Sequence, residues 1–106
     1  MTQEAPDPDA GTLALQEIEH GQPGRIIALD RANTMIGEPG SDTALIVKRG
    51  QALFLSRFAG HRRPRLNGVE VGPGAHEIGE HDRIEVGGAV FEVVRIRDES
   101  SVNTGT

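Results

Sequence analysis

The stretch RIEVGGAVFEVV, residues 83–94, decides the fold class of this chain. Apolar and charged residues alternate over residues 83–86, which is the pattern of a strand with one buried face and one solvated face. Gly87-Gly88 follows, and two glycines can take the backbone angles that a tight hairpin turn needs. A second β-prone run comes after the turn. We therefore predict a β-hairpin over this stretch.

The rest of the chain repeats the same design of short β-prone runs separated by turn residues. These runs cover residues 12–19, 25–29, 34–37, 43–47, 52–58, 64–71 and 76–78. No segment of helical length has a 3.6-residue apolar period free of Gly and Pro. Fourteen glycines fit a chain with many tight reversals. The sequence predicts an all-β fold, an antiparallel β-sandwich of about 8–11 short strands.

Length and composition predict one domain between two polar ends. The chain has 106 residues and a net charge of −5, which suits a single core. We expect the domain to span residues 12–97, with flexible tails at 1–11 and 98–106. The first tail is acidic and rich in proline, unlike a signal peptide. No apolar run is long enough to span a membrane, so we expect a soluble, cytoplasmic protein.

Several function classes find little support in the sequence. Phenylalanine is the only aromatic residue type, with three copies, and the chain is acidic, so we expect no nucleic-acid binding. His76 and His81 resemble a scrambled zinc motif, but a strand would turn them to opposite faces. No nucleophile motif or phosphate-binding glycine loop is present. We expect no enzyme activity, no metal and no cofactor.

The stretch HRRPRLNG, residues 61–68, gives this acidic protein a basic corner. No acidic residue occurs from Thr43 to Val69, and that quarter of the chain holds six of its eleven cationic side chains. They are Lys48, Arg49, Arg57, Arg62, Arg63 and Arg65. Arginine suits bidentate capture of phosphate or carboxylate. Solvated charges that protect strand edges against aggregation are the competing interpretation. Asn67-Gly68 predicts a type I′ turn.

The order of these pieces resembles the forkhead-associated (FHA) domain family. GRIIALDRANTMIG matches the family's opening strands, RLNGVEV matches its second Asn-Gly hairpin, and HEIGEHDRIEVGGAVFEVV matches its closing strands. The resemblance covers about residues 13–96. It implies an antiparallel β-sandwich that binds phosphothreonine peptides through loops at one end, and hence a protein partner.

The family's ligand-binding positions are where this chain departs from it. Glu38 stands where the family has an arginine that reaches the phosphate. Ser41 matches the phosphate-binding serine of the S-R-x-H-A segment, in an alignment that requires a deletion and puts Ala44 in place of the histidine. In the next loop, Gly60, Arg62, Arg63 and Pro64 replace the family's serine, asparagine, glycine and threonine. The usual pocket is therefore missing.

The resemblance nevertheless suggests a rewired anion site. FHA topology implies that the loop with Lys48 and Arg49 lies near loop 60–65. The candidate binding residues are then Ser41, Lys48, Arg49, Arg62 and Arg63. The expected function is a protein-interaction module that binds a phosphorylated or acidic peptide. The alternative is a phosphate-independent scaffold that keeps only the fold.

Overall fold

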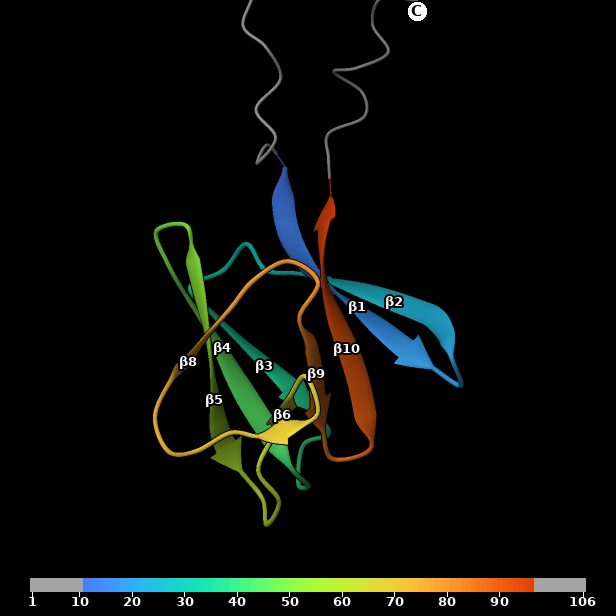
Figure 1. The fold of residues 1–106 in the computed structure, drawn as a ribbon, viewed down its shortest axis with the longest axis vertical. Helices are drawn as coiled ribbons and strands as arrows, with labels where there is room; N and C mark the ends of the chain where they lie inside the picture. Colours follow the sequence, from blue (N-terminus) through green and yellow to red (C-terminus); the bar gives the residue numbers. More distant parts are fainter. Residues whose placement is uncertain (1–10, 97–106) are drawn as a thin grey trace, which may run out of the picture.

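The computed structural model describes residues 11–96, which form ten strands in two sheets (Figure 1). The larger sheet has the strand order β2-β1-β10-β9-β6-β7, and the smaller has the order β3-β4-β5-β8. The strands are β1 (Thr12–Glu19), β2 (Gln22–Ala28), β3 (Asn33–Gly37), β4 (Thr43–Arg49), β5 (Ala52–Ala59), β6 (Arg65–Leu66), β7 (Val69–Glu70), β8 (His76–Ile78), β9 (Arg83–Val86) and β10 (Ala89–Ile96). Apart from Gly11, the predicted tails lie outside the described residues.

The all-β prediction is confirmed. Both sheets are antiparallel throughout and pack on one another as a sandwich. Residues 11–96 contain no helix, and so none that could cross a membrane. The deciding stretch forms the β9–β10 hairpin, with Val86 paired to Ala89 across the turn.

The core lies between the inner faces of the two sheets. Leu15, Ile84 and Val93 are fully buried on the larger sheet, and Ile46 and Leu55 are buried on the smaller one. In each strand they alternate with residues that point outward, as strand geometry requires. The alternation that predicted the strands therefore also supplies the core.

The Asn-Gly turn forms as predicted. Asn67 and Gly68 both have positive φ angles, 53° and 85°, as a type I′ turn requires. Leu66 pairs with Val69 across the turn, so the predicted run 64–71 is two short strands. Asn67 also has contacts that we did not predict. Its Nδ2 donates to Asp82 Oδ1 at 3.0 Å, and its Oδ1 accepts from Arg83 N at 2.9 Å.

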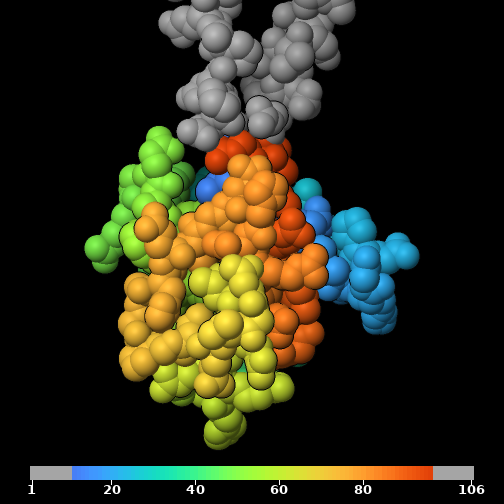
Figure 2. Space-filling view, in the orientation of Figure 1, coloured from blue at the N-terminus to red at the C-terminus, as the bar shows by residue number. Residues whose placement is uncertain are grey.

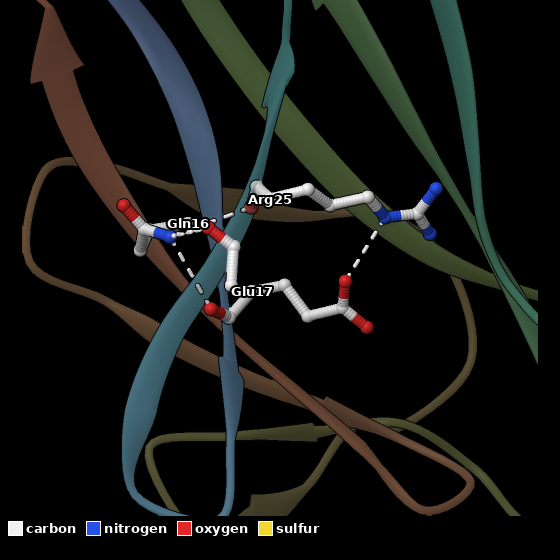
Figure 3. Close-up of polar contacts among 4 residues, drawn as sticks. Gln16, Glu17 and Arg25 are labelled. Atoms are coloured by element: carbon white, nitrogen blue, oxygen red, sulfur yellow. Dashed lines mark hydrogen bonds and ion pairs between the residues drawn. The ribbon is translucent and has the colours of Figure 1, made fainter.

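The β1–β2 hairpin projects from the body of the sandwich, as Figures 1 and 2 show. β2 begins at Gln22, earlier than predicted, and includes Pro23. Proline is tolerated there because β2 is an edge strand and needs no N–H on its open side. Cross-strand contacts hold the hairpin together (Figure 3): Gln16 Nε2 donates to Gly24 O at 2.8 Å, and Arg25 Nε contacts Glu17 Oε1 at 2.9 Å.

Candidate functional site at the loop end of the sandwich

Three connections meet at one end of the sandwich, which we call the loop end. They are residues 38–42 between β3 and β4, residues 60–64 between β5 and β6, and residues 87–88 between β9 and β10. Asp42 lies at their junction. Its side chain accepts hydrogen bonds from residues 61 and 62. A Cβ atom added at Gly87 would lie 3.6 Å from the Cβ atom of Asp42. Both sheets therefore contribute to this end.

The buried Asp42 side chain ties the first two connections together. Its Oδ1 accepts the backbone N–H groups of His61 at 2.8 Å and Arg62 at 3.2 Å. Its Oδ2 accepts Arg62 Nε at 3.0 Å. Two successive N–H groups aimed at one point form a nest, a concavity that binds anions. In this protein the anion in the nest is the Asp42 carboxylate.

The nest forms because Gly60 has a φ of +107°, which turns the following N–H groups toward Asp42. A Cβ atom at position 60 would collide with the Asp42 carboxylate and with its Cα atom. Arg57 Nη2 donates to the carbonyl oxygen of Gly60 at 2.8 Å and holds the loop from the strand side. The loop conformation and the Asp42 contact therefore require each other.

These contacts keep Asp42 ionised. The Arg62 backbone N–H has the largest effect and lowers the pKa of Asp42 below its ordinary value of 3.8. The Arg62 side chain and the His61 N–H lower it further, while burial acts in the opposite direction. Hydrogen bonds to a carboxylate favour its charged form. The nest thus holds a negative charge at neutral pH.

The lowered pKa predicts a stability difference that depends on pH. Asp42 binds its proton less readily in the folded state than in the unfolded chain, where its pKa is about 3.8. Its ionised form therefore contributes fully to the free energy of unfolding above pH 3.8, and this contribution is lost as the pH falls through the lower pKa of the folded state. We expect the Asp42→Asn variant to be less stable than the parent chain at neutral pH. The difference in unfolding free energy between the two proteins should become smaller as the pH falls below 3.8.

Urea unfolding of both proteins, on either side of that pH, measures the difference. Comparing the two proteins cancels the titration of the other carboxyl groups. If the difference in unfolding free energy stays constant over the acid range, the pKa of Asp42 in the folded protein is ordinary.

A cleft of about 740 Å³ opens beside the nest on the outer side of the smaller sheet. Its lining residues are Met35, Pro39, Gly40, Ser41, Asp42, Thr43, Phe58, Ala59, Gly60, His61 and Arg62. Met35 and Phe58 are 48% and 58% exposed. Phe58 is the extra residue where the β4–β5 register shifts, and such a bulge redirects side chains. We call this hollow the loop-end cleft. Its apolar walls suit a side chain of a partner.

A second cleft, of about 430 Å³, lies on the other side of Ser41 and Asp42. Glu17 and Glu19 of β1 line it together with Glu38. Glu38 is exposed in a turn, where its carbonyl oxygen accepts the Ser41 N–H at 2.9 Å. The gathering of carboxylates makes this side unsuitable for an anionic ligand.

Three of the five predicted site residues lie at the loop end. Ser41 is exposed and borders both clefts. Arg62 contacts Asp42 while 73% of its side chain stays exposed. Arg63 is half-buried and lines a smaller hollow of about 290 Å³ with Arg65, Glu70 and Glu85. Ser41 and Arg62 line the loop-end cleft together with Asp42, whereas Arg63 lines the separate, smaller hollow.

The expectation that Lys48 and Arg49 join them is wrong. β4 and β5 pair antiparallel, with Arg49 opposite Ala52 at one end and Thr43 opposite Ala59 at the other. The loop that follows Ala59 is therefore separated from Arg49 by the length of the hairpin. Figure 1 shows the β4–β5 turn at the top of the view and the loop after β5 at the bottom. The five residues do not form one anion site.

Asp42 is the site residue that sequence reasoning missed. Its donors lie 19 and 20 positions further along the chain, and no pattern around SDTALIV points to them. Within residues 11–96 there is no cluster of three His, Asp or Glu side chains that could hold a metal. The chain matches no model of a known protein family and no curated protein.

Proposed function

We propose that this chain is a protein-interaction module of the FHA-like kind that binds an unphosphorylated partner. One observation carries the proposal: the anion nest of the loop end is filled by the internal carboxylate of Asp42. The resemblance to the FHA family supports recognition at this end of the sandwich. The departures at Glu38, Arg62 and Arg63 support a mode of binding without phosphate.

Electrostatics at the loop end disfavours a phosphate. The backbone N–H groups that would capture it already bond to Asp42, and the Asp42–Arg62 pair is neutral as a unit. A phosphate on the outer side of Arg62 would lie near a fixed carboxylate, at a cost of about 1 kcal/mol per close pair in a wet site. Glu38 adds a further negative charge on the neighbouring cleft. Phosphorylation would therefore add little affinity.

The loop-end cleft supports binding of an apolar side chain instead. Exposed Met35 and Phe58 form its walls, and exposed apolar residues gathered in one place are typical of interaction sites. The charged residues Asp42 and Arg62 in its lining form an ion pair with each other. An apolar side chain of an unphosphorylated partner is therefore the ligand chemistry that this surface favours.

The test is an NMR titration of the labelled full chain with a degenerate phosphothreonine peptide pool and with its unphosphorylated twin. We expect the phosphorylated pool to cause no additional shifts at residues 38–42 and 60–64. Shifts at those residues that need the phosphate would contradict the proposal and favour a rewired phosphopeptide site.

Removing the internal carboxylate provides the matched control. In the Asp42→Ala variant the N–H groups of His61 and Arg62 lose their acceptor. We expect inorganic phosphate to shift these two amides at concentrations that leave the parent spectrum unchanged. Asp42→Ser serves as a second variant. If phosphate moves neither variant, the nest is not an anion site and Asp42 does not stand in for a ligand.

A further inference from the structure

The two sheets of residues 11–96 end in four edge strands, and three of these are protected against pairing with another chain. Natural edge strands are protected by shortness, by proline, by charged side chains or by irregular pairing. β7 has two residues and β8 has three. β2 carries Pro23 and Arg25, and its pairing with β1 shifts register. These three edges therefore make poor templates for a further strand.

β3 is the edge strand that lacks all of these protective features. Its length of five residues is ordinary for a strand, and it contains no proline and no charged side chain. Its pairing with β4 runs from Asn33 to Gly37 without a register shift. Met35, in the middle of the strand, is 48% exposed. An uncharged, regular edge of this kind is a template for an added strand.

The hydrogen-bonding pattern shows which backbone groups β3 offers on its open side. The Lys48 N–H donates to Ala32 O at 2.9 Å, so position 32 bonds toward β4. Along an antiparallel strand, such positions alternate with positions whose backbone groups point away from the neighbour. Thr34 and Ile36 therefore also bond toward β4. The outward N–H and C=O groups, which make no hydrogen bond within residues 11–96, belong to Asn33, Met35 and Gly37.

The loop-end cleft lies beside this open edge. Met35 belongs to β3 and also lines the cleft, as do Pro39 and Gly40 of the connection that follows β3. In an added strand, the residue directly opposite Met35 has its side chain on the same face of the sheet as Met35. That side chain would therefore lie at the cleft. Recognition by strand addition combines main-chain hydrogen bonds with pockets for alternate side chains, and the edge and the cleft supply both.

A second copy of the chain would use this edge less well. The antiparallel pairing that uses all of β3 is centred on Met35, and it places Asn33 of one copy opposite Gly37 of the other. Asn33 shares a face with Met35 because their positions differ by two, so a polar side chain would lie beside the apolar cleft. Five residues a side are also few compared with the roughly 20–30 a side in a stable interface between folded proteins. A peptide segment needs no such area.

We propose that β3 receives an extended, unphosphorylated segment of a partner protein as an additional strand of the smaller sheet. The outward backbone groups of β3 bond to the main chain of this segment, and one of its apolar side chains enters the loop-end cleft between Met35 and Phe58. This inference rests on the proposed phosphate-independent function and specifies how the partner binds.

Selection from a random library of unphosphorylated displayed peptides of about ten residues, with the full chain as bait, supplies the probe. We expect the selected peptides to carry apolar residues at alternate positions, with no proline between them. Phe58→Ser removes a wall of the cleft and should weaken the binding of these peptides about tenfold.

Asn33→Pro tests the added strand without changing the cleft. Asn33 lies outside the lining of the cleft, and it is the first residue of an edge strand, where proline is tolerated. Proline removes one outward donor and obstructs a neighbouring strand. We expect the selected peptides to bind about tenfold more weakly. Asn33→Ala is the matched control, because alanine keeps the N–H group, and its affinity should stay within about twofold of the parent.

Amide hydrogen exchange of the unaltered chain provides a second readout, which does not depend on the folding of any variant. In the free chain, the Met35 and Gly37 amides should exchange faster than those of Thr34 and Ile36. A saturating selected peptide should slow the Met35 and Gly37 amides at least about tenfold. The Thr34 and Ile36 amides already bond toward β4 and should change less.

The other outcomes separate this inference from the proposed function. Peptides that respond to Phe58→Ser but not to Asn33→Pro, and that slow no amide of β3, would occupy the cleft alone. They would overturn the added strand and leave the function standing. Failure to select any peptide would also overturn the inference. If the Met35 and Gly37 amides of the free chain become protected as the protein concentration rises, the edge binds a second copy instead. Binding that requires phosphate would contradict the function itself.

Discussion

The Gly60→Ala variant should be severely destabilised. At a φ of +107°, an alanine carries backbone strain of about 1–3 kcal/mol. The alanine methyl group would also collide with the side chain and the Cα atom of Asp42. Such overpacking costs about 1–3 kcal/mol. Together these amount to about 4 kcal/mol, a large part of the roughly 5–15 kcal/mol that stabilises a typical domain. Urea unfolding measures the loss.

Gly40→Ala is the matched control, because Gly40 belongs to the same end of the sandwich and has a φ of +86°, but nothing lies within 4 Å of its added Cβ. It should show only the strain cost. If Gly60→Ala and Gly40→Ala lose the same unfolding free energy, the backbone angle alone matters at position 60. In that case the close packing of loop 60–64 on Asp42 would contribute nothing.

The Asn67→Ala variant should lose about 2–3 kcal/mol of unfolding free energy, from two lost hydrogen bonds of about 0.5–1.5 kcal/mol each and from the strain of alanine at positive φ. The lost bonds are those to Asp82 and to the Arg83 N–H. They attach the β6–β7 turn to β9, so amide exchange at Arg83 should also speed up. Thermal unfolding and hydrogen exchange measure the two effects.

Asn67→Gly separates the two causes. Glycine accepts the φ of 53° without strain but cannot make either side-chain bond, so it should be less damaging than alanine. If Asn67→Gly is fully stable, the side-chain bonds are unimportant and Asn67 acts only as a turn former.

The basic stretch at residues 61–68 therefore serves several purposes at once. Arg62 neutralises Asp42, and Asn67 holds the turn on β9. Arg63 and Arg65 line a hollow that also contains two glutamates. Of these arginines, Arg62 is paired with a buried carboxylate, and the other two share their hollow with glutamates.

The position of Lys48 and Arg49 was within reach of sequence reasoning. The sequence predicts a strand over residues 52–58, between these cations and loop 60–65. The two ends of one strand lie at opposite ends of a sheet, so the two loops could not meet. The resemblance to the FHA family suggested otherwise, because it was applied to a segment where the alignment requires a deletion.

The sequence by itself determined the fold class, the β9–β10 hairpin and the Asn67-Gly68 turn. These features depend on alternation and on backbone angles, which are local properties of the chain. Only the tertiary structure decided the state of the loop end. Asp42 meets the N–H groups of His61 and Arg62 across 19 and 20 positions, and such a contact exists only after β4 and β5 have paired and Gly60 has turned the loop. Its partners are set by the packing of two connections, for which the sequence has no periodic signal.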